Sequence, residues 1–215
     1  MGRVRGKSWM HEHVADVYVK RARAEGLRSR AAYKLAQIAS RDRLLQPGMT
    51  VVDLGAAPGG WSQIAAGRVA PRGRVIALDL LEMPRLPGVT FIQGDFRDEA
   101  TIAELERALD GRKVDLVLSD MAPNLSGIAS VDQARALELA GLALDFALKH
   151  LKPQGNFVVK LFHGEGYEAY VKRLRACFRE VAVRKPDASR SRSSEVFLLG
   201  RGLKAHAARP AAANC

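Results

Sequence analysis

The sequence has little cysteine, and this shortage limits how the fold could be stabilised. Its only cysteines, Cys177 and Cys215, are far apart in the chain. They have neither the spacing of a disulfide framework nor that of a zinc site. We therefore expect a protein that folds in a reducing interior, in the cytoplasm, without a structural metal.

Long apolar runs are also missing. No stretch approaches the roughly 20 apolar residues that a membrane-spanning helix needs. The basic start of the chain, Met1–Lys7, is not followed by the apolar segment of a secretory signal. These absences predict a chain that neither crosses a membrane nor carries a signal peptide.

Aromatic residues make up only 6% of the chain, so stacking on exposed bases is not expected to be its main way of binding a partner.

Basic charge, by contrast, is abundant, and the net charge of +11 lies entirely in the two terminal segments. Residues 1–34 carry six more basic than acidic residues, and residues 184–215 carry five more. Basic segments attract a polyanion by releasing its counterions, which favours a nucleic-acid partner. The alternative is that they only keep the chain soluble.

The 215 residues suit one α/β domain with a full hydrophobic core. Residues 1–28 are polar and basic with weak apolar periodicity, which predicts an N-terminal arm. Residues 29–204 carry the patterned core domain. Residues 205–215 form an Ala-rich tail that we expect to be disordered. Nothing in the pattern suggests an obligate dimer, so a monomer is expected.

Strands and helices alternate along the core domain. A first helix is expected to start at a Ser29 cap and to run toward Leu45, before Pro47-Gly48. Short buried strands between helices predict a Rossmann-like α/β fold, with a mostly parallel seven-stranded sheet and helices on both faces. The expected strands are Thr50–Leu54, Arg74–Leu78, Val89–Ile92, Val114–Leu118, Asn156–Leu161 and Glu195–Gly200, the last paired with a short strand near Val181–Val183. The expected later helices are Trp61–Val69, Glu99–Leu109, Val131–Leu151 and Gly166–Phe178.

A glycine-rich loop after the first strand is the strongest local motif. It reads D-x-G-x-x-x-G from Asp53 to Gly59. Glycines let a ligand approach the backbone closely, but a dinucleotide site would have G-x-G-x-x-G instead. The acidic residue suits a cofactor that carries an amino-acid ammonium group. A purely structural turn is the alternative.

Aspartates follow the next two strands. Asp79 ends the second strand, where a carboxylate can accept both ribose hydroxyls of an adenosine. NAD and S-adenosylmethionine both present these hydroxyls, so Asp79 does not distinguish them. Asp95 follows the third strand and is placed to accept a hydrogen bond from an adenine amino group. Each aspartate alone is more often a cap or turn residue, but the glycine-rich loop beside them favours ligand binding.

The fourth and fifth strands end in residues suited to catalysis. Ser119–Asn124 lacks the Asn/Asp-Pro-Pro-aromatic sequence that amino-methyltransferases commonly carry here. The fifth strand ends in Lys160, and an amine at the end of a buried strand is costly unless it is paired or functional. A lysine that reaches to the surface is the alternative.

Together these segments resemble the FtsJ (RrmJ) family of bacterial ribosomal RNA ribose methyltransferases. The resemblance covers roughly residues 9–204. It rests on Ser29–Leu35, Asp53–Trp61, Ser119–Gly127, Phe157–Gly166, Arg184–Asp187 and Ser193–Val196.

The resemblance implies that residues 29–204 form an S-adenosylmethionine-dependent methyltransferase domain. It implies methylation of a uridine ribose 2′-hydroxyl in 23S rRNA, met within the 50S subunit. Messenger-cap and transfer-RNA ribose methyltransferases share the same tetrad, so this target rests on whole-chain similarity. By resemblance, the catalytic tetrad falls on Lys34, Asp120, Lys160 and Glu195, and the cofactor contacts fall on Gly59, Trp61, Asp79, Asp95 and Asp120.

An alcohol is a poor nucleophile at neutral pH and gains from a base within hydrogen-bond reach. Our hypothesis is that Lys160 takes the proton, while Asp120 and Lys34 orient the hydroxyl oxygen. A neighbouring ammonium, from Lys34, and partial burial would favour the neutral form of Lys160. Glu195 would position a lysine or the ribose.

Two competing functions remain open from the sequence. A nicotinamide-dependent reductase would use the same kind of sheet, but the missing G-x-G-x-x-G counts against it. A ribosome-assembly factor would use a relict methyltransferase fold to bind RNA, and the intact tetrad argues against that. No metal is required, and His11-Glu12-His13 is expected to be a polar stretch of the arm rather than a ligand set.

Overall fold

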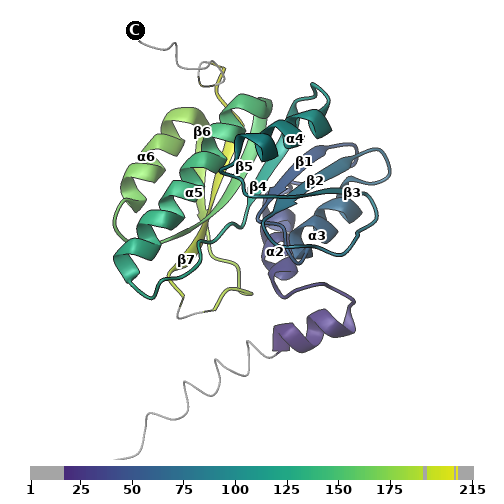
Figure 1. The fold of residues 1–215 in the computed structure, drawn as a ribbon, viewed down its shortest axis with the longest axis horizontal. Coiled ribbons are helices and arrows are strands. Elements are labelled where there is room, and N and C mark those ends of the chain that lie inside the picture. Colours follow the sequence, from purple (N-terminus) through teal and green to yellow (C-terminus); the bar gives the residue numbers. More distant parts are fainter. Residues whose placement is uncertain (1–16, 191–192, 206, 208–215) are drawn as a thin grey trace, which may run out of the picture.

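A computed structural model describes residues 17–190, 193–205 and 207, and its centre is one seven-stranded sheet (Figure 1). The strand order is β3-β2-β1-β4-β5-β7-β6. Every neighbouring pair is parallel except those that β7 makes with β5 and β6. The predicted fold class is thereby confirmed, including the pairing of Val181–Val183 with β7. The strands are β1 (Thr50–Leu54), β2 (Arg74–Asp79), β3 (Val89–Gln93), β4 (Val114–Ser119), β5 (Leu151–Phe162), β6 (Phe178–Arg184) and β7 (Glu195–Leu203).

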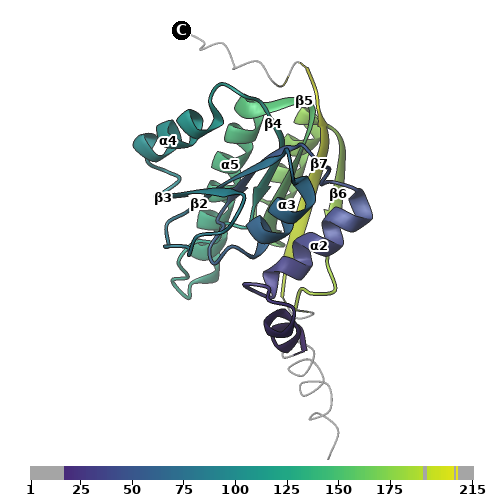
Figure 2. The ribbon, with the colours of Figure 1, turned by 90° about the vertical axis from the view of Figure 1, so that its right-hand side faces the viewer.

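Helices cover both faces of the sheet (Figure 2). Side chains of α4 (Glu99–Leu109), α5 (Ala129–His150) and α6 (Tyr167–Cys177) share one core cluster with the strands. Those of α2 (Ala31–Asp42) and α3 (Gly60–Val69) share a second cluster. A sheet that is buried on both faces explains why its central strands are mostly apolar rather than alternating between apolar and polar residues.

The first helix departs from the sequence prediction at both ends. Its N-cap is Arg30, without a side-chain capping bond, and Ser29 is not the cap. A Cβ on Gly60 would lie 2.3 Å from Ser29 Oγ, so the hydroxyl packs against the start of α3 instead of folding back. The helix ends at Asp42 because Arg43 is left-handed, which turns Leu44 and Leu45 into the core.

Strand β5 begins earlier than predicted. Leu151 belongs to the strand, not to helix α5, and pairs with Val114. The register then shifts before Asn156, and Gln154 adopts a φ of 70°. This irregular stretch is a bulge inside the strand, although its Pro-Gln-Gly sequence is typical of a turn.

Only part of the predicted N-terminal arm is described. Residues 17–24 are helical, and Tyr18 and Ala22 pack with Tyr33 and Ala188. His11-Glu12-His13 and most of the predicted tail, residues 206 and 208–215, lie outside the described residues. In the part of the chain that the structure describes, no helix is long and apolar enough to cross a membrane.

Candidate active site

The candidate site lies where parallel strands β1, β2, β4 and β5 end. Because these strands run in one direction, the residues that follow them meet at the same edge of the sheet. A cavity of about 550 Å³ opens there. Of the sequence-predicted residues, Asp79, Asp95 and Asp120 line it, together with Gly55 and Ala57 of the glycine-rich loop.

The glycine-rich loop needs its glycines for different reasons. Gly55 has a φ of 78°, and a Cβ there would lie 2.7 Å from the backbone nitrogen of Met121. Gly59 has a φ of 102° and forms the N-cap of α3. A side chain at either position would strain the backbone and displace a neighbour, so both glycines allow the loop to pack closely against the residues around it.

Asp53 is buried below this loop. Its Oδ2 accepts a 2.6 Å hydrogen bond from Ser62, while Oδ1 receives none from the residues that the structure describes. Burial, reinforced by the charges of Asp120 and Asp79, raises the pKa of Asp53 to about 7, although the Ser62 hydrogen bond opposes the shift. A positively charged ligand group near Oδ1 would relieve this penalty.

Asp79 organises the edge of the cavity. Its carboxylate accepts 2.8 Å hydrogen bonds from the backbone N–H groups of Ala57 and Leu81. The side chains of Leu80 and Leu81 beside it are 54% and 66% exposed. Each carboxylate oxygen keeps a second lone pair, so Asp79 still has acceptors for ligand hydroxyls.

Asp95 faces Arg97 in the structure. Arg97 donates to it through its side chain, at 2.5 Å from Nη2 to Oδ2, and through its backbone N–H. The side-chain bond, followed by the backbone bond, lowers the pKa of Asp95 to about 2. Asp95 is therefore fully ionised at neutral pH, and Arg97 is a cavity residue that the sequence analysis missed.

Trp61 and Gly59 do not line the cavity. The Trp61 side chain is 2% exposed, packs against Phe197 and donates its indole N–H to the carbonyl of Ala31 at 2.9 Å. The side chain thus ties α3 to α2. Any contact between position 61 and a ligand would have to come from the backbone.

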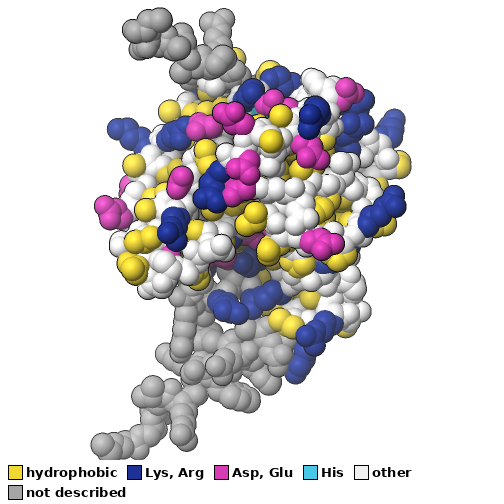
Figure 3. All heavy atoms as spheres, viewed as in Figure 1, with side chains coloured by type: hydrophobic (Ala, Val, Ile, Leu, Met, Phe, Trp, Pro, Cys, Tyr) yellow, Lys and Arg dark blue, Asp and Glu magenta, His cyan; other side chains and the backbone are white. Residues whose placement is uncertain are grey.

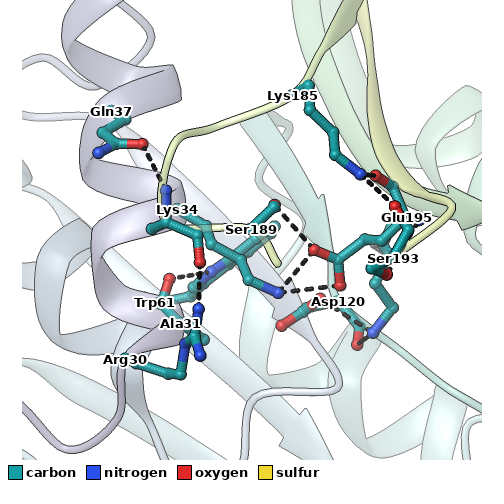
Figure 4. Close-up of polar contacts among 12 residues, drawn as sticks. Arg30, Ala31, Lys34, Gln37, Trp61, Asp120, Lys185, Ser189, Ser193 and Glu195 are labelled. Atoms are coloured by element: carbon teal, nitrogen blue, oxygen red, sulfur yellow. Dashed lines mark hydrogen bonds and ion pairs between the residues drawn. The ribbon is translucent and has the colours of Figure 1, made fainter. Parts of the chain in front are cut away.

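The structure brings all four tetrad residues together as two neighbouring ion pairs, and Figure 4 shows Lys34, Asp120 and Glu195 close to one another. Lys34 Nζ lies 2.7 and 2.9 Å from the two carboxylate oxygens of Glu195. Lys160 Nζ donates to the Asp120 carbonyl at 2.6 Å and lies 3.0 Å from Asp120 Oδ1. This second contact is an ion pair without hydrogen-bond geometry, since Oδ1 accepts no hydrogen bond in the described structure.

The two ion pairs share one electrostatic environment. Burial raises the pKa of Glu195, but the hydrogen bond and charge of Lys34, a hydrogen bond from Ser189 and the charge of Lys160 lower it overall. Glu195 is therefore an anion beside the side-chain nitrogens of Lys34 and Lys160. All four side chains are at most 18% exposed, so solvent screens these charges only weakly.

Sequence reasoning missed the residues that hold Glu195 and the loop in place. Ser189 donates to Glu195 Oε1 at 2.9 Å, and Lys185 donates to the backbone carbonyls of Ser193 and Glu195. Arg28 donates to the carbonyl of Pro58 in the glycine-rich loop and to those of Pro84 and Arg85 in the segment between β2 and β3, and so ties the two segments together. Nothing in the local sequence signalled these contacts, because each partner depends on the folded chain.

Basic side chains gather beside the tetrad. Figure 3 shows Lys and Arg at the end of the molecule where the helical residues 17–24 meet the body. Burial and the charge of Arg190 lower the pKa of Arg30. Arg190 acts on Arg30 because the two basic terminal segments bring these two arginines close together. Among the described residues, no group of three or more His, Cys, Asp or Glu side chains could hold a metal ion.

Comparisons with known proteins show which family the chain is similar to. Residues 27–203 match the FtsJ-like methyltransferase family. The chain is 62% identical to the ribosomal RNA large subunit methyltransferase E of Azoarcus sp. (strain BH72), over 92% of this chain and 97% of that protein. It is 60% identical to the protein of the same name from Methylobacillus flagellatus, over 90% of this chain and 94% of that protein.

Solved structures give the same fold. A ribosomal RNA methyltransferase from Plasmodium falciparum matches with a TM-score of 0.74 and 27% identity, over 82% of this chain and 98% of that one. An rRNA methylase from Clostridium thermocellum matches with a TM-score of 0.53 and 19% identity, over 79% of this chain and 97% of that one, which shows the fold alone.

Proposed function

The chain belongs to the FtsJ-like methyltransferase family, and we propose that it methylates the ribose 2′-hydroxyl of a uridine in 23S rRNA. The observation that carries this proposal is the pair of ion pairs, Lys34–Glu195 and Lys160–Asp120, beside the cavity at the strand ends. The names of the relatives, which are 57–62% identical, support large-subunit ribosomal RNA as the substrate.

S-adenosylmethionine is the proposed cofactor. Its ammonium group is proposed to lie near Asp53, which does not itself line the cavity but whose buried Oδ1 has no donor in the described structure. Its adenosine suits Asp79 for the ribose hydroxyls and Asp95 for the adenine amino group. When bound, S-adenosylmethionine supplies a methyl carbon that its sulfonium makes electrophilic. Gly59, Trp61 and Asp120 complete the proposed set of contacts, with position 61 contributing its backbone.

Lys160 is the proposed general base. A neutral amine has two N–H groups and one lone pair. The carbonyl of Asp120 accepts one N–H at 2.6 Å, and the Asp120 carboxylate lies 3.0 Å from Nζ without hydrogen-bond geometry. The Nζ lone pair would then accept the proton of the substrate hydroxyl while the hydroxyl oxygen bonds to the methyl carbon, and the broken carbon–sulfur bond would leave the cofactor as a neutral thioether.

Lys34 and Asp120 are proposed to orient the hydroxyl oxygen. The Glu195 carboxylate holds Lys34 Nζ through two hydrogen bonds, so that the ammonium is fixed rather than free to swing. A fixed ammonium stabilises negative charge that develops on the oxygen. Because the methyl donor is already activated, such positioning supplies much of the rate.

We further propose that the enzyme acts as a monomer on the 50S subunit. Residues 29–204 would form the methyltransferase domain. The basic segments on either side would grip phosphates across folded RNA and read shape more than sequence.

The test is methyl transfer from labelled S-adenosylmethionine to 50S particles and, in parallel, to transfer RNA. Ribose methylation is mapped by resistance to alkaline cleavage. We expect one 2′-O-methyluridine in the large-subunit RNA. Lys160→Ala should lower its rate of formation by about a hundredfold or more, while cofactor affinity stays unchanged.

Other outcomes separate the alternatives. Near-normal turnover by Lys160→Ala would exclude Lys160 as the base. Label in transfer RNA alone would keep the chemistry and overturn the target. Tight cofactor binding without transfer to any RNA would favour a ribosome-assembly factor, and binding of a nicotinamide cofactor instead would favour a reductase.

A further inference from the structure

A second cavity, of about 400 Å³, lies next to the tetrad. Several of the residues that line this cavity are close in sequence to tetrad residues. Ser194 precedes Glu195, Phe162 lies two positions beyond Lys160, and Pro123 three beyond Asp120. The lining residues include Pro123, Leu125, Ala129, Gln133, Phe162 and Ser194.

The two cavities adjoin. Pro123 lines both of them, so the loop after β4 forms a shared wall. Asp120 lines the larger cavity, and its Lys160 partner lies on the strand that ends at the smaller one. The catalytic side chains therefore lie between the two cavities. A group bound in the smaller cavity would be on one side of them, and a cofactor bound in the larger cavity would be on the other.

The chemistry of the smaller cavity favours a neutral ligand over a phosphate, although His163 also lines it. Its lining contains no lysine or arginine, whereas Asp132 and Glu165 contribute carboxylates. Pro123, Leu125 and Phe162 contribute apolar surface. Apolar walls with a few polar groups suit a neutral, planar ligand such as a nucleobase.

Gln133 gives this cavity a fixed hydrogen-bond acceptor. Its Nε2 donates to the carbonyls of Phe162 and Glu165, at 3.1 and 3.2 Å. Both N–H groups of the amide are thus used, and the two carbonyls set its orientation. Oε1 receives no hydrogen bond from a described residue and stays available to a ligand donor.

On the basis of the proposed function, we propose that this cavity binds the base of the nucleotide whose ribose is methylated, and that Gln133 Oε1 accepts the N3–H of uracil. Methylation needs the base to turn aside from its stack so that the 2′-hydroxyl reaches Lys160. A pocket beside the tetrad holds the turned base. Cytosine presents an acceptor at N3, so the same amide oxygen rejects it.

The first test fills the cavity from an exposed position. Ala129 is the first residue of α5, lines the cavity and is exposed, so Ala129→Phe leaves the core intact. Ala134→Phe, at an exposed position of the same helix outside both cavities, is the matched control. We expect Ala129→Phe to lower kcat/KM for 50S particles by about a hundredfold, with unchanged S-adenosylmethionine affinity, and the control to stay near wild type.

The second test measures the preference of the enzyme for uridine over cytidine at the target position. Wild type and Gln133→Met are assayed on 50S particles with the target uridine intact or mutated to cytidine. Wild type should favour uridine, and Gln133→Met should narrow that preference by about tenfold or more.

Equal activity of Ala129→Phe and Ala134→Phe, or an unchanged base preference in Gln133→Met, overturns the base pocket while the proposed function stands. Failure of wild type to methylate any RNA overturns both.

Discussion

Asp53 is a fully buried aspartate in strand β1. Its pKa of about 7 lies above the ordinary value of 3.8 because the ionised form is desolvated. The folded chain therefore binds a proton that the unfolded chain releases between these two values. Stability contributed by this protonated group is present at low pH and is lost as the pH rises through about 7. We propose that this costly charge is kept for the proposed cofactor rather than for the fold.

Asp53→Asn should remove this pH dependence. The variant should gain on the order of a few kcal/mol of unfolding free energy over wild type at pH 8, and much less at pH 5. It should also bind S-adenosylmethionine more weakly, since the carboxylate is lost. Denaturant unfolding at the two pH values and calorimetric titration measure both effects. Asp145→Asn, at a 58% exposed side chain, is the control and should change neither. Equal gains at pH 5 and pH 8 would contradict the assigned titration.

Lys34 and Glu195 should act as one unit. Each is at most 14% exposed, so removing one leaves the other as an uncompensated charge. We expect Lys34→Ala and Glu195→Ala each to lower kcat, and the double variant to be little worse than either one. A double-mutant cycle in stability should give a coupling of about 1–3 kcal/mol. The exposed pair Arg173–Asp145 provides the comparison, where about 0–1 kcal/mol is expected. Additive losses at Lys34 and Glu195 would show that the two residues act independently.

The sequence pattern predicted some residues of the site directly, others only through the family resemblance, and others not at all. Asp120 and Lys160 follow or end buried strands, so the pattern itself placed them at the sheet edge. Lys34 and Glu195 are 161 positions apart, and only the family resemblance joined them. Ser189 could not be found in advance, because a serine in a polar segment shows no sign of the carboxylate it will contact.

Helix α5 shows what periodicity reveals about an element. Ala136, Ala140, Ala143 and Ala147 recur at helical spacing and are buried. Small side chains let this helix approach the sheet closely. Periodicity predicted the helix but not the place where it yields to β5, because Leu151 is apolar in either element. The bulge before Asn156 escaped prediction because strand pairing overrides its turn-like sequence.

Ala143→Leu tests the close approach of α5. Ala143 is fully buried, so the extra atoms have no room, and the variant should lose about 1–3 kcal/mol of stability. Ala134→Leu at an exposed position should change stability by no more than about 0.5 kcal/mol. The stabilities of the two variants are measured by thermal or denaturant unfolding. Equal stabilities would show that the interface between α5 and the sheet can accommodate a larger side chain at position 143.

At the scale of the whole molecule, folding brings the two basic ends together. Tyr18 and Ala22 pack with Tyr33 and Ala188, and Arg30 donates to the Ala188 carbonyl. Segments more than 150 positions apart thus form one basic surface beside the tetrad. The sequence predicted the charge at both ends, but composition alone cannot tell that the ends converge.

This convergence predicts how RNA affinity responds to salt. If both segments contact phosphates, Arg23→Gln and Arg190→Gln should each weaken 50S binding and each reduce the slope of log Kd against log salt by about 1. The double variant should reduce it by about 2, because the contacts release separate counterions. Arg107→Gln on α4, which has the same charge change at an exposed position, should leave the slope unaltered. The measurement is Kd for 50S particles across a salt series. If all three substitutions shift the slope equally, RNA is attracted by net charge alone, and the basic surface beside the tetrad has no special part in binding.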